Sequence, residues 1–313
     1  MQKIPVGATI AHASGFVVRN FLNILGIMAL PMIVMWIPSF VMRPQMMAAS
    51  AGMAAQDYSA IARLWTILLP LYAVGFVLMA MQFIGLSELA LGTKKAPRWF
   101  YFSLGAPVWR LVGSFLFLIL LVFLILLVFL GVFAAMFANV ILGGLVKVAR
   151  GGGMAGWAVA LSGAIVLVGT VVIWCGYLYA LVRLGFLLIP VIAAREPGFS
   201  VARGWALGRG NFWRMFALLL VNWLPLVVLE GIVVFAVMFN GVPLPPPHAS
   251  PAQSAAFQAA MQERVMHLMT GIYQHWYITL PVFVVLMVLF YGFGVGTQVF
   301  AYRALTSDEV AGD

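Results

Sequence analysis

The residues best suited to chemistry in this sequence are four polar side chains inside long apolar runs. Glu88 and Arg183 each lie near the end of such a run, and Asn222 and Glu230 share nearly the same face of a third run. Ionisable side chains are costly to place in a bilayer, so those that occur there mark ion pairs, proton relays or substrate paths. We prefer a packing role, with Glu88 paired to Arg183 and Glu230 hydrogen-bonded to a neighbouring helix. The alternative is that the four line a cavity.

A second polar group precedes the last apolar run. Glu263 and His267 are four residues apart, and His275 follows eight residues later. Zinc sites usually need three or four ligands that are themselves held by hydrogen bonds, so this group does not predict a metal site. Phosphate-loop, nucleophile-elbow and paired-carboxylate signatures are missing, and Cys175 is the single cysteine. We therefore expect no enzyme activity, no catalytic residues, no metal and no cofactor.

The composition identifies the elements that must hold these side chains. Of the 313 residues, 65% are hydrophobic and the mean hydropathy is +1.10, whereas soluble domains are roughly 45–50% apolar. The apolar runs fall near 20–42, 64–92, 111–146, 155–182, 215–241 and 277–302. Each is long enough for a transmembrane helix, which needs about 20 apolar residues. The sequence predicts an all-α polytopic membrane protein with six transmembrane helices in three hairpins.

The distribution of cations gives an orientation. If both termini lie inside, the inner segments hold eleven lysines and arginines and the outer loops hold five, with Arg183 in neither group. The positive-inside rule therefore predicts cytoplasmic termini. The net charge of +9 does not indicate nucleic acid, because the cations lie in short loops between apolar runs. The outer segment 242–276 is expected to form a proline-rich loop followed by an amphipathic helix.

The stretch "PGFSVARGWALGRGNFWRMF" (197–216) combines arginines with aromatic residues. Ser200 is expected to cap a helix with an apolar face, and such a basic aromatic helix is typical of a segment lying in the membrane interface. The candidates for contact with lipid headgroups, here and before the third run, are Arg98, Arg110, Arg203, Trp205, Arg209, Trp213 and Arg214. The alternative is that these arginines only set the topology.

The same stretch indicates an internal repeat. Residues 102–115 ("FSLGAPVWRLVGSF") align with 199–212 ("FSVARGWALGRGNF") without a gap, and 5–21 fits more loosely. We predict three parallel units, each with an interfacial helix, a span, an outer loop and a returning span. Their bounds are 1–95, 96–195 and 196–313. A fixed period of this kind determines the architecture, although chance similarity between basic, apolar segments is the alternative.

Residues 181–221 carry a family resemblance. The segment resembles bacterial membrane proteins related to the membrane region of glycerophosphodiester phosphodiesterases, a group that includes the YciC-like proteins. The matching residues are Arg183, Pro190, Glu196, Trp205, Leu207, Gly210, Asn211, Trp213 and Arg214, and Gly204 stands where serine is usual. The resemblance implies a location in the bacterial inner membrane. No catalytic barrel follows in this sequence, so the resemblance implies no catalytic residues.

The sequence leaves two candidate functions. The first is a non-catalytic membrane module that binds anionic lipid headgroups or a membrane partner, either a second copy or another protein. The second is a transporter or flippase-like carrier of a lipid or amphiphile, with Glu88, Arg183, Asn222 and Glu230 inside the bundle. A polar cavity through these four residues would favour the carrier, and a dry core would favour the module.

Overall fold

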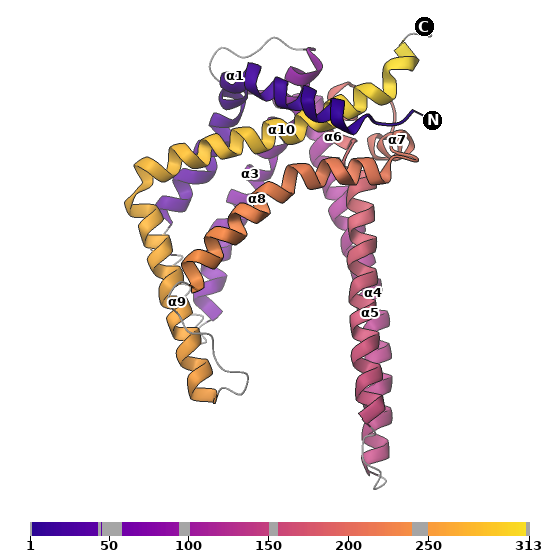
Figure 1. The fold of residues 1–313 in the computed structure, drawn as a ribbon, viewed down its shortest axis with the longest axis vertical. Helices are drawn as coiled ribbons and strands as arrows, with labels where there is room; N and C mark the ends of the chain where they lie inside the picture. The colour runs from indigo at the N-terminus through magenta and orange to yellow at the C-terminus, as the bar shows by residue number, and fades with distance from the viewer. Residues whose placement is uncertain are drawn as a thin grey trace.

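Helices account for every regular element in the part of the chain that the structure describes. The structure is a computed structural model, and it describes residues 2–42, 45, 58–93, 101–149, 156–239 and 250–310. The elements are α1 (Val6–Val41), α3 (Tyr58–Leu91), α4 (Ala106–Ala149), α5 (Gly156–Ala180), the π-helical η1 (Leu181–Gly185), α6 (Leu188–Ala193), α7 (Ser200–Leu207), α8 (Phe212–Phe239), α9 (Pro251–Gln274) and α10 (Trp276–Val310) (Figure 1).

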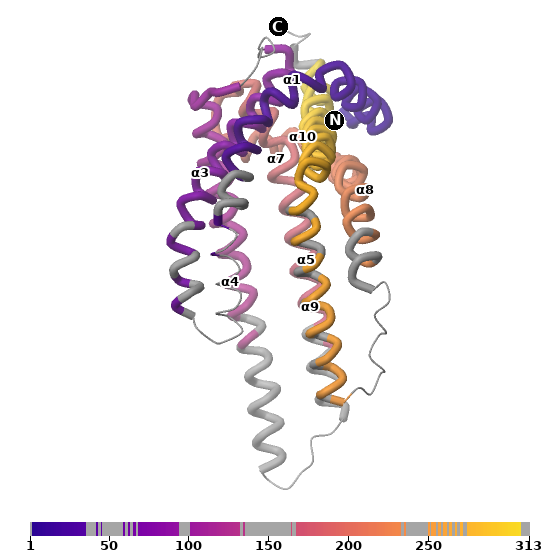
Figure 2. The backbone as a smooth tube through the Cα atoms, turned by 90° about the vertical axis from the view of Figure 1, so that its left-hand side faces the viewer, coloured from indigo at the N-terminus to yellow at the C-terminus, as the bar shows by residue number. Residues whose placement is uncertain are grey.

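Six helical segments are long and apolar enough to cross a membrane. They are Val6–Met35, Leu68–Leu91, Ala106–Gly131, Leu167–Ala193, Phe212–Ile232 and Trp276–Ser307. This confirms the prediction of an all-α polytopic membrane protein. An even number of spans returns the chain to its starting side, and both chain ends indeed lie at one end of the molecule (Figures 1 and 2). We call this end the terminal end.

Large apolar side chains cover the outside of several spans. Val128 of α4, Trp174 of α5 and Ile232 of α8 are all exposed. A water-soluble protein rarely exposes apolar patches that continue along whole helices. In a bilayer the same side chains contact acyl chains, while the helices satisfy their own backbone hydrogen bonds. Lipid is therefore the solvent that this surface fits.

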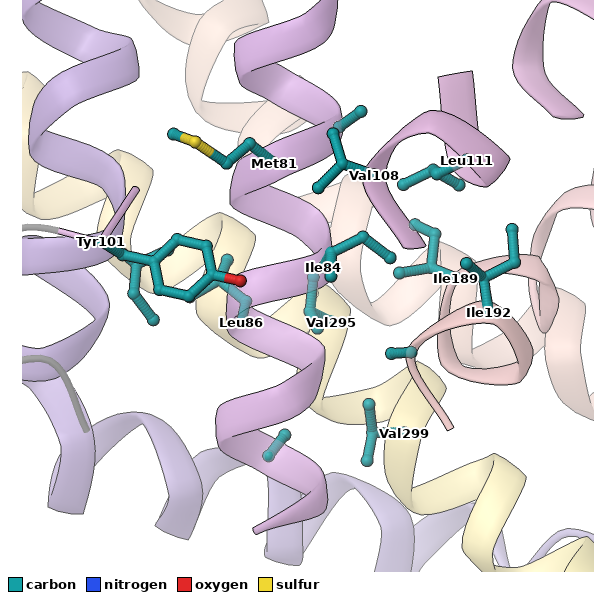
Figure 3. Packing of buried hydrophobic residues seen from close by; sticks show 14 of the residues in the cluster. Met81, Ile84, Leu86, Tyr101, Val108, Leu111, Ile189, Ile192, Val295 and Val299 are labelled. Atoms are coloured by element: carbon teal, nitrogen blue, oxygen red, sulfur yellow. The ribbon is translucent and has the colours of Figure 1, made fainter. Parts of the chain in front are cut away.

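The main buried core lies towards the terminal end. It joins α3, α10, the middle of α1, the start of α4 and the short α6, in which all six residues are buried. A helix that is apolar all round must be enclosed by other helices, and α6 meets that condition. Figure 3 shows ten labelled members of this core: Met81, Ile84, Leu86, Tyr101, Val108, Leu111, Ile189, Ile192, Val295 and Val299.

Two glycines one turn apart let α10 approach α1 closely. A Cβ atom on Gly292 would lie 2.9 Å from Ile24 Cδ1, and one on Gly296 would lie 3.2 Å from Ala13 Cβ. Small residues at helix crossings permit this spacing in membrane proteins. Gly292 and Gly296 therefore lie where α10 packs closely against α1.

Replacing Gly296 with leucine is expected to reduce the free energy of unfolding by about 2 kcal/mol, the usual cost of overpacking. The added side chain meets the Cα of Ala13 as well as its Cβ, and a backbone atom cannot move aside cheaply. Gly231→Leu is the matched control, because a Cβ there meets nothing within 4 Å. Melting in detergent, followed by loss of monodisperse protein on a sizing column, measures both variants. Equal melting temperatures would contradict the close approach.

The three segments that precede the odd-numbered spans take three forms. In α1, Asn20 has non-helical backbone angles (φ −116°, ψ 18°), so a kink separates a lead-in helix from the span. In the second unit, α4 begins at Ala106 and continues through the span without a separate helix. In the third unit, α7 is a distinct helix before α8. The repeat stays a prediction, and Arg98 lies outside the described residues.

The expected outer helix is present as α9. Its N-terminus carries a capping box, in which the Ser250 hydroxyl accepts from the Gln253 backbone N–H and the Gln253 side chain accepts from the Ser250 N–H. Two of the backbone donors that a helix start leaves unpaired are satisfied in this way. Most of the proline-rich loop before α9 lies outside the described residues.

Candidate functional site

The turn after α6 places two charged side chains at the terminal end. The Arg195 N–H donates to the Ile192 carbonyl and the Glu196 N–H donates to the Val191 carbonyl, which is the pattern of a Schellman cap. Arg195 takes a left-handed conformation (φ 59°) at the position that glycine usually fills. A non-glycine residue pays a steric cost there. The cap reverses the chain between α6 and α7 and fixes Glu196 between them.

Glu196 links α7 to α10. One carboxylate oxygen accepts a hydrogen bond from the Arg203 Nε at 2.5 Å, and the other accepts from the Tyr302 hydroxyl. The Glu196 side chain is 16% exposed and that of Arg203 is 33% exposed, so water only partly screens the pair. Charge-assisted hydrogen bonds of this kind are about twice as strong as neutral ones. The sequence offered Glu196 only as a family-motif residue and gave no signal for Tyr302.

Arg110, at the start of α4, holds the same turn from a second side. One terminal guanidinium nitrogen donates to the carbonyls of Glu196 (3.1 Å) and Gly198 (3.2 Å) and to the Ser200 hydroxyl (2.9 Å). The prediction that Ser200 caps α7 is wrong. Phe199 occupies the cap position, where its side chain makes no hydrogen bond, and the buried Ser200 hydroxyl accepts from Arg110.

Glu88 is buried in α3, as its position in an apolar run predicts. The Tyr101 hydroxyl donates to one carboxylate oxygen at 3.0 Å, and an Arg195 nitrogen lies 3.8 Å from the other. Within the described residues Glu88 therefore pairs with Arg195, and the expected pairing with Arg183 is wrong. The cap after α6 brings Arg195 to Glu88, whereas Arg183 is held on the α7 side of η1.

Arg183 lies in η1, where the backbone forms a π-helix instead of continuing α5. It is only 5% exposed, its Cζ lies 4.3 Å from the centroid of the Trp205 ring, and its Nε has no hydrogen-bond partner in the described part of the chain. A desolvated cation–π contact contributes about 2 kcal/mol. Burying an ion costs several kcal/mol, so the Trp205 ring alone does not offset the burial of this cation.

Asn211, just before α8, anchors the N-terminal segment. Its Oδ1 accepts from the Ile4 backbone N–H at 3.0 Å, and its Nδ2 donates to the Gln2 carbonyl at 2.9 Å. Both Asn211 and Ile4 are buried. A primary amide has one acceptor and two donors, so it fits a backbone N–H and a backbone carbonyl together.

Asn211→Ala is expected to reduce the free energy of unfolding by about 2 kcal/mol, since it removes two hydrogen bonds and leaves a buried N–H unpaired. The freed segment should also be cut faster by trypsin after the exposed Lys3. Intact mass at timed intervals reports that cut. Gln274→Ala, at an exposed position in α9, serves as the control. Unchanged cleavage in Asn211→Ala would show that the anchor holds nothing in place.

The arginines of the 197–216 stretch divide into two groups. The Arg203 side chain pairs with Glu196, whereas the side chains of Arg209 and Arg214 have no hydrogen-bond or ion-pair partner within the described residues. Arg209 is exposed, Arg214 is half-buried, and the neighbouring Trp213 is 75% exposed. Trp213 also belongs to an aromatic group with Phe212 and Phe216. An exposed tryptophan between two free arginines is typical of the membrane–water interface.

Asn222 and Glu230 do not form one polar site. Asn222 lines a groove of about 430 Å³ between α1, α8 and α10, together with Pro225 and Leu229. Glu230 follows Asn222 by eight residues, which turns its position around α8 by roughly 80°. Glu230 therefore lies beside this groove, and it is exposed. Its side chain makes no hydrogen bond within the described residues, so the predicted bond from Glu230 to a neighbouring helix is wrong.

A second cavity of about 450 Å³ lies between α1, α3 and α10. Five methionines line it: Met28, Met32, Met35, Met79 and Met287. Methionine is flexible and fills irregular apolar space. Neither of these two described cavities is lined by Glu88, Arg183 or Glu230.

Comparison with known proteins returned no family model, curated protein or solved structure that matches the chain. The family resemblance of residues 181–221 therefore stays a prediction from the sequence.

Proposed function

We propose that the protein is a non-catalytic integral membrane module that binds anionic lipid headgroups at its terminal end. In this proposal the terminal end faces the cytoplasm and the protein lies in the inner membrane of a bacterium. The observation that carries the proposal is the α7–α8 junction, where Arg209, Trp213 and Arg214 are available while Arg203 is held by Glu196. A protein partner at the same surface is a further expectation.

The junction presents these side chains from a defined backbone. Gly210 takes a left-handed conformation (φ 76°), and the Asn211 N–H donates to the Gly208 carbonyl. The anchoring of Asn211 to Gln2 and Ile4 fixes this turn further. A guanidinium donates two parallel hydrogen bonds to a phosphate, and each basic residue near an anionic surface contributes about 1 kcal/mol. Trp213 would lie at headgroup depth beside them.

The two described cavities support the module over the carrier. Both are lined mainly by apolar side chains, and of the four intramembrane polar candidates only Asn222 borders one of them. A carrier of a charged headgroup needs polar groups along its path, because an unpaired charge in an apolar passage is costly. We therefore keep the lipid or amphiphile carrier as the weaker proposal.

The proposal is tested by lipid-dependent melting. In mild detergent, phosphatidylglycerol is expected to raise the melting temperature of the wild-type protein more than phosphatidylcholine does. Reversing the charge of two arginines in Arg209→Glu/Arg214→Glu should abolish the difference between the lipids, because the phosphate loses its donors.

Arg264→Glu is the control, since it reverses a cation on α9, away from the α7–α8 junction. It should leave the preference for phosphatidylglycerol in place. An equal response of the wild-type protein to both lipids would contradict the proposal. So would a preference that survives the double reversal.

A further inference from the structure

Among the described cations of the terminal end, Arg183 is the one that is buried. Arg110 donates to three acceptors, Arg203 pairs with Glu196, and Arg303 donates to the Leu91 carbonyl at 2.6 Å. Arg183 is more than nine-tenths buried, yet it has no carboxylate, carbonyl or hydroxyl partner within the described residues. A buried charge normally has a counter-charge, because the fold gains nothing from leaving it unpaired.

The nearby carboxylates are already used. Glu88 accepts from Tyr101 and lies beside Arg195, and Glu196 accepts from Arg203 and Tyr302. The protein therefore presents an arginine without an anion. We propose that Arg183, oriented by Trp205, binds the phosphate of one phospholipid molecule at a defined site. This inference rests on the proposed function and names one site for it.

The local backbone is consistent with a binding role. η1 replaces one turn of α-helix by a wider π-turn, a feature that occurs frequently at functional sites. The Trp205 ring, 4.3 Å from the Arg183 Cζ, covers one face of the guanidinium. The N–H groups point outwards in the plane of a guanidinium, so stacking on a ring leaves them able to donate to phosphate oxygens.

Aromatic side chains beside Arg183 indicate a ligand with an apolar part. The Tyr179 ring lies 6.1 Å from the Trp205 ring and 4.9 Å from the Phe212 ring, and Tyr179 and Trp205 are both exposed. A phospholipid supplies a phosphate for the guanidinium and acyl chains for the apolar surface outside it. Inorganic phosphate shares the first of these groups but has no tail, so the two sources can be told apart.

Native mass spectrometry of the detergent-solubilised protein with phosphatidylglycerol tests the site. As collision energy rises, the wild-type protein is expected to keep one lipid after the others have left. Arg183→Gln should lose that last lipid, with at least a tenfold lower affinity in titration. Arg183→Lys keeps the charge but loses the planar fork and should fall between the two. A wild-type protein that keeps no last lipid, or Arg183→Gln that keeps it equally well, would overturn the proposal.

Trp205→Leu keeps the test valid if the Arg183 variants fold poorly, because Trp205 is 39% exposed. This variant should lower the affinity for the last lipid severalfold while Arg183 keeps its charge. If the last lipid stays bound up to the same collision energy as in the wild type, the role of the Trp205 ring is overturned. Inorganic phosphate at millimolar concentration should not displace the lipid; displacement would reassign the site to a soluble anion. Arg209→Glu/Arg214→Glu should reduce the number of weakly bound lipids and leave the last lipid bound. The two sets of variants therefore separate failure of this site from failure of the proposed function.

Discussion

Replacing Glu196 with alanine is expected to reduce the free energy of unfolding by about 4 kcal/mol. The change leaves the Arg203 guanidinium and the Tyr302 hydroxyl without their shared acceptor. Removing the shared acceptor of a charge-assisted hydrogen bond from a partly buried pair costs more than the pair itself contributes. The substitution also disconnects α7 from α10.

The measurement is thermal melting in detergent, with and without added lipid. Glu196→Gln retains one acceptor oxygen and loses the charge, so its melting temperature should lie between those of the wild type and Glu196→Ala. Glu263→Gln is the matched control, because the Glu263 side chain is 74% exposed. If Glu196→Ala melts together with Glu263→Gln, Glu196 does not hold the terminal end together.

Replacing Arg110 with alanine is expected to reduce the free energy of unfolding by about 3 kcal/mol, because three acceptors on the α6–α7 turn lose a charged donor together. Two of these acceptors are the backbone carbonyls of Glu196 and Gly198, and the third is the buried Ser200 hydroxyl. Arg110→Lys should recover less than half of the loss, because an ammonium group lacks the planar fork of a guanidinium.

Lipid dependence separates a turn-holding role of Arg110 from contact with headgroups. Arg110→Ala should lower the melting temperature equally in phosphatidylglycerol and phosphatidylcholine, since the Arg110 Nη2 group donates inside the protein. Arg209→Glu is the contrasting variant, and its effect should appear mainly in phosphatidylglycerol. A loss in Arg110→Ala that is confined to phosphatidylglycerol would assign Arg110 to the headgroups instead.

Local periodicity was sufficient to predict the six long apolar helices. Long apolar runs specify transmembrane helices because only internally hydrogen-bonded segments are stable in lipid. Gly292 and Gly296 lie one turn apart on the face of α10 that contacts α1, and small residues at this spacing permit the close approach.

The polar contacts of the terminal end could not be predicted in the same way. Glu196 and Tyr302 are 106 positions apart, and Ile4 and Asn211 are 207 apart. Such partners depend on how the three hairpins pack, and one sequence carries no signal for that. The Ser200 prediction was wrong in a similar way, since the partner of its hydroxyl is Arg110 of another helix, 90 positions earlier in the sequence.

The most direct test of headgroup binding is the lipid composition of protein extracted from its own membrane into polymer nanodiscs. We predict that anionic phospholipid is enriched around the wild-type protein relative to the bulk membrane, and that Arg209→Glu/Arg214→Glu reduces this enrichment. A co-extracted lipid composition equal to that of the bulk membrane, unchanged by the double reversal, would contradict headgroup binding as the function of this surface.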